Sequence, residues 1–287
     1  MKHCKVRCFL LAVLVLVGGC ITVYVLVGKD RPAPIPQKKK IYEGVTYHRV
    51  VRFIPRAMIV HVLVIDTKAG RLEFLVTPPD SEEGPPLRAR TTSQFLDEFD
   101  LQIAVNGDGF FPWWSRNPAD YYPHVGDPVT PNGFAASRGK VYSDGIEPSL
   151  FISRRNALTF LNKPGNVFNA ISGDRMLVLK GERVPGLDNK ELEPRTAIGT
   201  NKNGRYLILI VVDGRQPYYS SGATFLELAE LLLRFNAYYG MALDGGGSST
   251  MVIEGDDGQP IILNSPIDNY IPSREWPVAN HLGVYIR

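Results

Sequence analysis

Three consecutive glycines followed by three hydroxyl residues constrain this chain more than any other feature. They follow a single carboxylate, Asp244, in the run ALDGGGSSTMV over residues 242–252. Glycine inside a regular element costs roughly 0.5–1 kcal/mol relative to alanine, so three together indicate backbone with positive φ or in close contact with a ligand. Successive N–H groups in such a turn can bind an anion, and hydroxyls add further donors. The alternative to an anion-binding site is a tight turn that Asp244 caps. A turn alone, however, requires neither three glycines nor three hydroxyl residues after them.

The first forty residues differ in kind from the rest. Lys2, Lys5 and Arg7 precede an uncharged run over residues 8–28, which is long enough to cross a bilayer. A cleavable signal peptide has a shorter apolar core and a small-residue cleavage site. We therefore expect one uncleaved transmembrane helix over about residues 9–27. With the short basic N-terminus in the cytoplasm, the rest of the chain lies outside it.

The charge distribution supports a separate domain after this segment. Residues 31–36 alternate with proline and indicate a stiff spacer. Residues 1–40 hold eight basic residues and one acidic residue, a net charge of +7, whereas the whole chain carries +3, which leaves about −4 for the remainder. We expect residues 1–40 to form a basic N-terminus, anchor and linker, and residues 41–287 to form one globular domain. Its acidic balance argues against a nucleic-acid partner.

Most of this domain has the pattern of short strands. A hairpin with an Asn-Gly turn is expected around residues 201–204. Apolar residues at three- and four-residue spacing predict an amphipathic helix over residues 222–236. A second, short helix opens at Thr92. The fold class is therefore α+β, with a mixed, largely antiparallel sheet core and few helices.

Two further strand ends have side chains that could bind a substrate or take part in a reaction. The first is the loop NGDGFFPWW over residues 106–114, where aromatic rings can form a pocket wall that stacks on a sugar. A hydrophobic turn filled by Phe110 and Phe111 would also explain this loop. The second strand end is Asp213-Gly214-Arg215, which provides another carboxylate beside a glycine.

Taken together, these motifs resemble the phosphodiester glycosidase family. The matching segments are NGDGFF at residues 106–111, PRTAIG at 194–199, the strand–DGR–helix at 213–215, ALDGGGSSTM, and R-x-x-PVAN-x-LGV from Arg274. The resemblance covers residues 45–287 in the family's order. Asp108 departs from the expected pattern, which is a simpler NGGFF.

The resemblance implies a hydrolase that cleaves a sugar-1-phosphodiester, of the N-acetylglucosamine-1-phosphodiester type, to free sugar and phosphomonoester. We expect it to act on an envelope or extracellular glycan, such as an exopolysaccharide. Asp244 and Asp213 are the expected catalytic carboxylates, and Arg195 is the expected phosphate clamp, unless it forms a structural ion pair with one of them. The other expected substrate contacts are Asn106, Gly107, Asp108, Phe110, Thr196, Gly245, Gly246, Gly247, Ser248, Ser249, Thr250 and Arg274.

Two other classes of function stay open. A metal-dependent phosphodiesterase could hold calcium or magnesium on Asp213 and Asp244, although the histidines lack ligand spacing. A non-hydrolytic module could hold a polysaccharide for assembly. The first choice is a hydrolase that requires no cofactor, and a strong general acid is unnecessary because a phosphomonoester is already a good leaving group.

Overall fold

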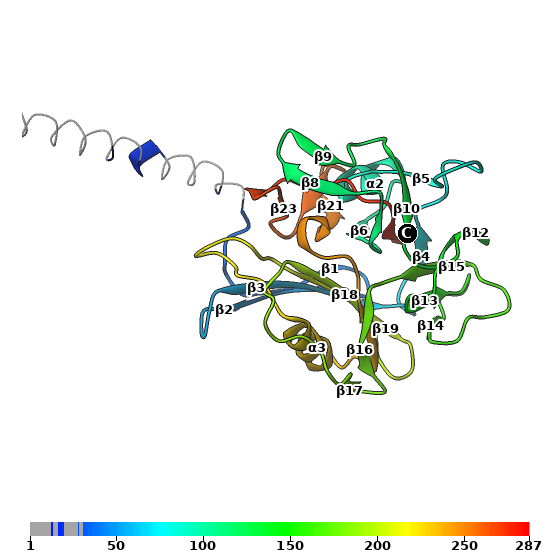
Figure 1. Cartoon of the computed structure of the whole chain (residues 1–287). Helices are drawn as coiled ribbons and strands as arrows, with labels where there is room; N and C mark the ends of the chain where they lie inside the picture. Colours follow the sequence, from blue (N-terminus) through cyan, green and yellow to red (C-terminus); the bar gives the residue numbers. More distant parts are fainter. Residues whose placement is uncertain (1–12, 14–16, 20–27, 29–30, 287) are drawn as a thin grey trace, which may run out of the picture.

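We describe the protein from a computed structural model (Figure 1). It describes residues 31–286 together with Val13, residues 17–19 and Gly28. The transmembrane helix expected over residues 9–27 lies outside this part of the chain, apart from Val13 and residues 17–19. No helix within the described residues is both long enough and apolar enough to cross a bilayer.

An eight-stranded sheet forms the base of the domain (Figure 1). Its strand order is β1-β2-β3-β19-β18-β20-β16-β17, and each neighbouring pair is antiparallel. The strands are β1 (Gln37–Tyr42), β2 (Val45–Arg52), β3 (Met58–Asp66), β16 (Arg175–Leu179), β17 (Glu182–Arg183), β18 (Arg195–Thr200), β19 (Tyr206–Val212) and β20 (Tyr239–Ala242).

Both faces of this sheet are buried. Because successive side chains of a strand point to opposite faces, Leu209 of β19 joins the main core and Ile210 packs on the other side. That other side is covered by the helix α3 (Phe225–Arg234). The helix begins at a capping box in which Thr224 and Glu227 satisfy each other's backbone N–H groups.

Two five-stranded sheets pack on the main core from the opposite side. Their strand orders are β22-β21-β6-β25-β4 and β12-β11-β15-β13-β14. The first contains β4 (Leu72–Val76), β6 (Ile103–Asn106), β21 (Met251–Glu254), β22 (Pro260–Ile262) and β25 (His281–Ile286). The second contains β11 (Ala135–Ser137), β12 (Lys140–Ser143), β13 (Ser149–Ile152), β14 (Leu158–Phe160) and β15 (Asn169–Ser172). The short helix α2 (Thr92–Glu98) covers the first sheet with Phe95 and Leu96.

Shorter elements complete the upper part of the molecule in Figure 1. The strands β5 (Leu87–Arg88), β10 (Pro128–Pro131) and β7 (Phe110–Phe111) form one small sheet. Two ribbons, β8 (Trp114–Asn117) with β9 (Asp120–Tyr122) and β23 (Ile267–Asp268) with β24 (Ile271–Pro272), lie near the 3-10 turn η1 (Gly246–Ser248). Ser115 Oγ donates to Asn269 Oδ1 at 2.8 Å, which connects the two ribbons.

The expected antiparallel sheets with few helices are confirmed, and the strand pairings described above are all antiparallel and not mixed. The turn at residues 201–204 also forms, with Gly204 N–H donating to the Asn201 carbonyl at 3.0 Å. The domain begins earlier than expected, because β1 starts at Gln37 within the segment assigned to the linker. Three exposed lysines follow it on this edge strand, where charge discourages pairing with another chain.

Candidate active site

Asp244 lies where the eight-stranded sheet meets the sheet that contains β6. It follows the end of β20, and its backbone is held by the loop after β6. The Asp244 N–H donates to the Gly107 carbonyl at 2.9 Å, and Asn106 Nδ2 donates to the Asp244 carbonyl at 2.8 Å. The Asn-Gly pair of one sheet therefore fixes the carboxylate-bearing residue of the other.

Asn106 is itself fixed by buried partners. Its Oδ1 accepts from Thr196 Oγ1 at 2.8 Å and from the Thr250 N–H at 3.2 Å. Gly107 has no room for a side chain, since a Cβ there would lie 2.3 Å from Asn280 Oδ1. We expected Asn106, Gly107, Thr196 and Thr250 to contact substrate. The structure corrects this, because they are buried and position the backbone of Asp244.

The Asp244 carboxylate faces the cleft with both oxygens held. Oδ1 accepts from the Gly245 N–H at 2.9 Å, and Oδ2 accepts from Ser248 Oγ at 2.6 Å. Burial raises the pKa of Asp244 to about 7, and the nearby Asp108 carboxylate adds to the rise. These two hydrogen bonds oppose that rise in pKa, because they favour the ionised form. Asp244 can therefore exchange a proton near neutral pH.

The glycine run makes the turn that the sequence indicates, but its amides serve other partners. Gly246 has φ of 60°, the left-handed region that favours glycine. The Gly245 N–H donates to Asp244, and the Gly246 N–H donates to the Pro194 carbonyl at 2.8 Å. Two of the three amides expected to bind phosphate are thus already satisfied. Gly247 instead leaves room for Trp276, since a Cβ there would lie 2.8 Å from the indole ring.

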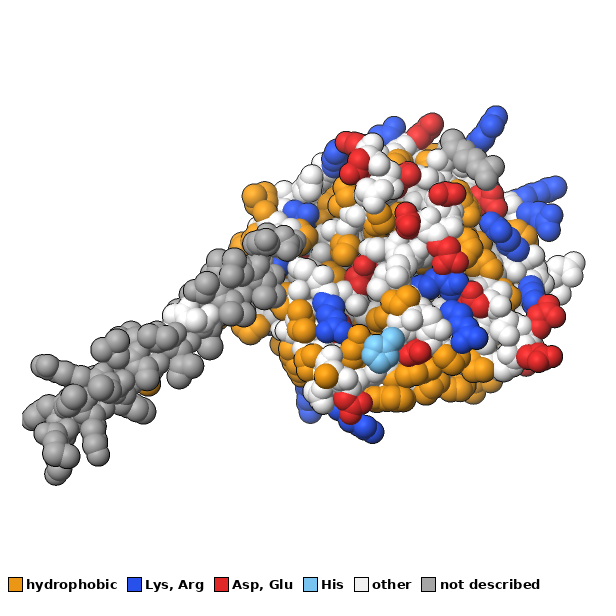
Figure 2. All heavy atoms as spheres, turned by 90° about the horizontal axis from the view of Figure 1, so that it is seen from above, with side chains coloured by type: hydrophobic (Ala, Val, Ile, Leu, Met, Phe, Trp, Pro, Cys, Tyr) orange, Lys and Arg blue, Asp and Glu red, His pale blue; other side chains and the backbone are white. Residues whose placement is uncertain are grey.

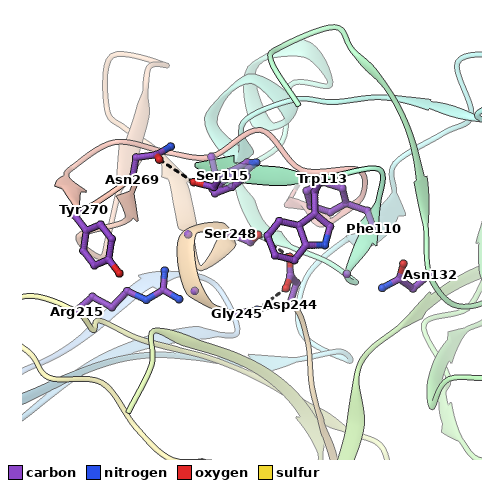
Figure 3. A pocket seen from close by; sticks show the side chains of 14 residues that line it. Phe110, Trp113, Ser115, Asn132, Arg215, Asp244, Gly245, Ser248, Asn269 and Tyr270 are labelled. Carbon is purple, nitrogen blue, oxygen red and sulfur yellow. Dashed lines mark hydrogen bonds between the residues drawn. The ribbon is translucent and has the colours of Figure 1, made fainter. Parts of the chain in front are cut away.

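One side of the cleft is rich in aromatic side chains (Figure 3). This aromatic compartment has a volume of about 390 Å³. In Figure 3, Trp113 lies in front of Asp244, and Tyr270 stands beside Arg215. The compartment is lined by Gly109, Phe110, Trp113, Ser115, Asn132, Arg215, Asp244, Gly245, Gly246, Gly247, Ser248, Asn269, Tyr270 and Trp276.

The other side of the cleft is charged. This charged compartment has a volume of about 460 Å³ and shares with the first compartment Gly109, Asn132, Arg215, Asp244, Gly245 and Gly246. Its other lining residues are Asp108, Glu147, Asp174, Glu193, Arg195, Phe225 and Leu243. Asp244 therefore lies at the boundary between aromatic rings and charged groups.

Asp108 is the second carboxylate beside Asp244. Its Oδ2 accepts from the Gly133 N–H at 2.6 Å and from Ser172 Oγ at 2.8 Å. Burial raises the pKa of Asp108 to about 6. This residue, which departs from the expected family pattern, thus holds the loop at Gly133 and lines the charged compartment.

Two arginines reach the charged compartment in different ways. Arg195, expected as the phosphate clamp, packs its guanidinium on the Phe225 ring, with Cζ 3.8 Å from the ring centroid. Its Nε donates to the Ala223 carbonyl at 3.2 Å, and burial lowers its pKa. Arg195 makes these contacts in place of the ion pair with Asp213 or Asp244, which was the alternative to a role as phosphate clamp. Arg215 pairs with Glu193 and lines both compartments.

Asp213, the other expected catalytic carboxylate, is enclosed in the interior. It pairs through Oδ2 with His61 Nε2 at 3.0 Å, and its Oδ1 accepts from the Ser265 N–H at 2.7 Å. Asn264 Nδ2 lies 3.3 Å from the same oxygen, and Tyr47 hydrogen-bonds the other nitrogen of His61. With 1% of its surface exposed, Asp213 is too buried to meet a substrate.

Some of the other expected residues line the cleft, and others are buried or paired elsewhere. Phe110 and Ser248 line the aromatic compartment. Ser249 is buried beneath the turn, and Arg274 pairs with Asp268 at 2.8 Å and lies over the Tyr121 ring. In the part of the chain that the structure describes, no three His, Cys, Asp or Glu side chains converge as metal ligands.

Comparison with known proteins places this site in a family. The family model for phosphodiester glycosidases matches residues 99–285, which include the loop after β6, Asp213, Arg215 and the glycine turn. The chain belongs to the phosphodiester glycosidase family. The description of this family is that of hydrolases which act on glycosidic phosphodiesters.

The relatives of this phosphodiester glycosidase extend the comparison. The bovine N-acetylglucosamine-1-phosphodiester alpha-N-acetylglucosaminidase is 39% identical over 64 residues, which are 22% of this chain and 12% of the bovine protein. The zebrafish catalytic domain of the same name, auto-inhibited by its pro-peptide, has a TM-score of 0.61 at 19% identity and covers 91% of this chain and 93% of that one. The structure of a hypothetical protein from Synechocystis has a TM-score of 0.64 at 14% identity. The match covers 89% of this chain and 64% of the Synechocystis chain. At these identities, the two structures show a shared fold.

Sequence reasoning missed several residues of the cleft. Arg215 belongs to the DGR motif that drew attention to Asp213, so a signal for it was present. The others were not singled out, because segments far apart in the chain bring them to the cleft; they are Asn132, Glu147, Asp174, Glu193, Phe225, Asn269, Tyr270 and Trp276.

Proposed function

We propose that this phosphodiester glycosidase hydrolyses a sugar-1-phosphodiester, of the N-acetylglucosamine-1-phosphodiester type, to free sugar and a phosphomonoester. The observation that carries the proposal is the position of Asp244. Its carboxylate, with a pKa of about 7, lies between a compartment of aromatic rings and a compartment with two arginines. A sugar phosphodiester has the same two halves, an apolar ring face and an anion.

The two compartments suggest how the substrate is oriented. The rings of Trp113 and Trp276 can contact the C–H face of the sugar, as aromatic side chains commonly do. Arg215, which reaches both compartments, can pair with the phosphate at the boundary, where a guanidinium offers two parallel N–H groups. This orientation brings the anomeric carbon next to Asp244.

In the proposed reaction, Asp244 acts as the general base. It accepts a proton from a water whose oxygen attacks the anomeric carbon, and the bond from that carbon to the phosphate oxygen breaks. The phosphomonoester leaves with the bonding electrons, and Arg215 stabilises its added negative charge. Asp108 lies close enough to raise the pKa of Asp244, so it tunes when the base is ionised.

Turnover of an aryl phosphodiester of N-acetylglucosamine tests this proposal. The purified full chain should release N-acetylglucosamine and aryl phosphate, and Asp244→Asn should abolish the release. Asp256→Asn is the matched control, because Asp256 is an exposed aspartate in another glycine-bearing turn. Activity that chelation removes and calcium or magnesium restores would favour a metal-dependent phosphodiesterase. Binding of the sugar phosphate without any turnover would favour a polysaccharide-binding module.

We also propose that residues 9–27 anchor the enzyme in a membrane, with the catalytic domain outside the cytoplasm, where it acts on an envelope or extracellular glycan. The support is the uncharged run over residues 8–28 after three basic residues. The full chain should stay with membranes after alkaline extraction, and external protease should digest its domain in intact cells. Extraction into the soluble fraction would contradict the anchor.

A further inference from the structure

Three exposed apolar side chains gather where the chain enters the domain. They are Phe53, Ile54 and Tyr218, with 65%, 87% and 97% of their surfaces exposed. We call these three residues the apolar rim. Single exposed apolar residues are ordinary, but a group on adjoining loops marks a surface for an apolar partner.

The two loops of the apolar rim are tied together by hydrogen bonds. The Ser221 N–H donates to the Ala57 carbonyl at 2.9 Å, and the Ile59 N–H donates to Ser220 Oγ at 3.0 Å. Arg56 also donates to the Gly222 carbonyl at 3.4 Å. These hydrogen bonds place the two loops that carry the rim side by side.

The linker is fixed beside this surface. Tyr219 OH donates to the Pro32 carbonyl at 2.9 Å, and the Arg31 guanidinium lies 5.4 Å from the centre of the Tyr219 ring. Arg49 holds the next carbonyl, that of Ala33, at 2.9 Å. The segment that follows the uncharged run is thus attached next to Tyr218.

The length of this attachment limits how far the rim can lie from the end of the uncharged run. Only four residue steps separate Gly28, the last residue of the run, from Pro32. A fully extended chain covers at most about 3.6 Å per residue, so Pro32 lies within about 14 Å of Gly28. The polar layer on each side of a bilayer is roughly 5–7 Å thick. A membrane-spanning run would therefore keep the rim at the bilayer surface.

The chemistry of this end suits a bilayer surface. Tyrosine is enriched at membrane interfaces, where its ring is apolar and its hydroxyl is wet. Arg31 and Arg52 add positive charge near the rim, which favours anionic lipids. Figure 2 shows acidic and basic side chains interspersed over the face that it presents.

The cleft opens beside the rim. Arg215, which lines both compartments, precedes Tyr218 by three residues on the same loop. Gln216, on that loop, donates to the Ser265 carbonyl at 2.8 Å and so joins it to the segment before β23. The turn after β23 presents Tyr270, which is 80% exposed and lines the aromatic compartment.

We propose that the apolar rim rests on the bilayer and that the cleft takes a sugar-1-phosphodiester whose alcohol is a membrane lipid. This inference rests on the proposed function and adds the class of the alcohol. Hydrolysis adds water across the bond between the anomeric carbon and the phosphate oxygen. It releases the sugar to water and leaves the lipid phosphomonoester in the membrane.

The experiment uses the full chain reconstituted in vesicles of phosphatidylcholine and phosphatidylglycerol. Two substrates are compared, an N-acetylglucosamine-1-phosphodiester of a long-chain alcohol in the same vesicles and a soluble aryl diester. The double variant Ile54→Ser/Tyr218→Ser should lose at least roughly tenfold in turnover of the vesicle-held diester, because removing buried apolar area weakens docking. Its turnover of the soluble diester should stay unchanged. The matched control Val141→Ser/Ile146→Ser alters two exposed apolar residues away from the linker and should affect neither substrate.

A second measurement reads docking without catalysis. Lipids brominated in their acyl chains should quench the added fluorescence of Tyr218→Trp, but not that of Ile146→Trp. Equal loss on both substrates in the rim variant would overturn the proposal, since it would mean that the cleft itself is damaged. Unchanged turnover with an unquenched Tyr218→Trp, or a dimer that dissociates in the rim variant, would also overturn it. Failure of the wild-type chain on the soluble diester would instead contradict the proposed function, and quenching would still report docking.

Discussion

The turn at Asp213 and the turn at Asp244 look alike in the sequence and differ completely in the structure. Each aspartate follows a buried strand and precedes a glycine, and the two strands β19 and β20 both lie next to β18. Both pair antiparallel to β18, so they run in the same direction and end at the same edge of the sheet. Only Asp244 faces the cleft.

The difference arises from what covers each carboxylate. Asp213 is enclosed by His61 of β3 and by the segment that carries Asn264 and Ser265. Asp244 accepts hydrogen bonds from Gly245 and Ser248 of its own turn, and its side chain lines both compartments of the cleft. The same Asp-Gly pattern at a strand end therefore gives a buried carboxylate in one place and a cleft-lining carboxylate in the other.

The largest expected effect is on turnover when Asp244 loses its charge. Asp244→Asn keeps an oxygen for the Gly245 N–H, and Ser248 can accept from the new amide, so the turn should persist. Loss of a general base should lower turnover of the aryl diester by roughly 10²–10⁴. Steady-state kinetics measures this, with Asp256→Asn as the control. Near wild-type turnover would give the catalytic role to another group, such as Asp108.

Asp213→Ala should lower the free energy of unfolding and leave the rate of the chemical step largely unchanged. It leaves the Ser265 N–H and the His61 imidazole without their buried acceptor, at about 1–3 kcal/mol for each unsatisfied group. Urea unfolding should show this loss, and the folded fraction should keep most of its turnover. If Asp213→Ala lost turnover as completely as Asp244→Asn and kept its stability, Asp213 would have the catalytic role and the comparison between the two turns would be wrong.

Gly246→Ala tests the geometry of the open turn. At φ of 60° an added Cβ costs about 1–2 kcal/mol, and it would lie 3.1 Å from Arg215 Nη2. The variant should fold, because a domain has roughly 5–15 kcal/mol of stability. Displacement of Arg215 should weaken binding of a sugar-1-phosphate by calorimetry. Gly258→Ala, also at positive φ but with open space around it, is the control and should leave this affinity unchanged.

The raised pKa of Asp244 also predicts how stability depends on pH. The pKa of Asp244 is about 7 in the folded protein, above its ordinary value of 3.8. Between these values the folded state binds this proton more strongly than the unfolded state, so stability falls as pH rises from about 4 to 7. Urea unfolding should show that the wild type loses stability over this pH range relative to Asp244→Asn. If the unfolding free energies of the two proteins changed with pH in parallel, the raised pKa of Asp244 would be contradicted.

Several features could be predicted from local patterns. The apolar run of β19, the turn at residues 201–204 and the helix α3 depend on residues near one another in the chain, and each element is present in the structure. The start of the domain was misplaced because three lysines resemble a linker, although they belong to an edge strand. An exposed edge strand lacks the apolar pattern that marks a buried one.

The sequence alone determined the family, the antiparallel sheets and the glycine turn that holds Asp244, because these follow from short motifs and alternating side chains. Only the tertiary structure decided which of the two carboxylates is enclosed in the interior and which lines the cleft. Burial depends on segments that lie far apart in the chain, as when Ser265 closes over Asp213 and Arg215 meets Gly246. Both turns have the same local pattern, and only the packing around them makes one a structural element of the interior and the other the centre of the cleft.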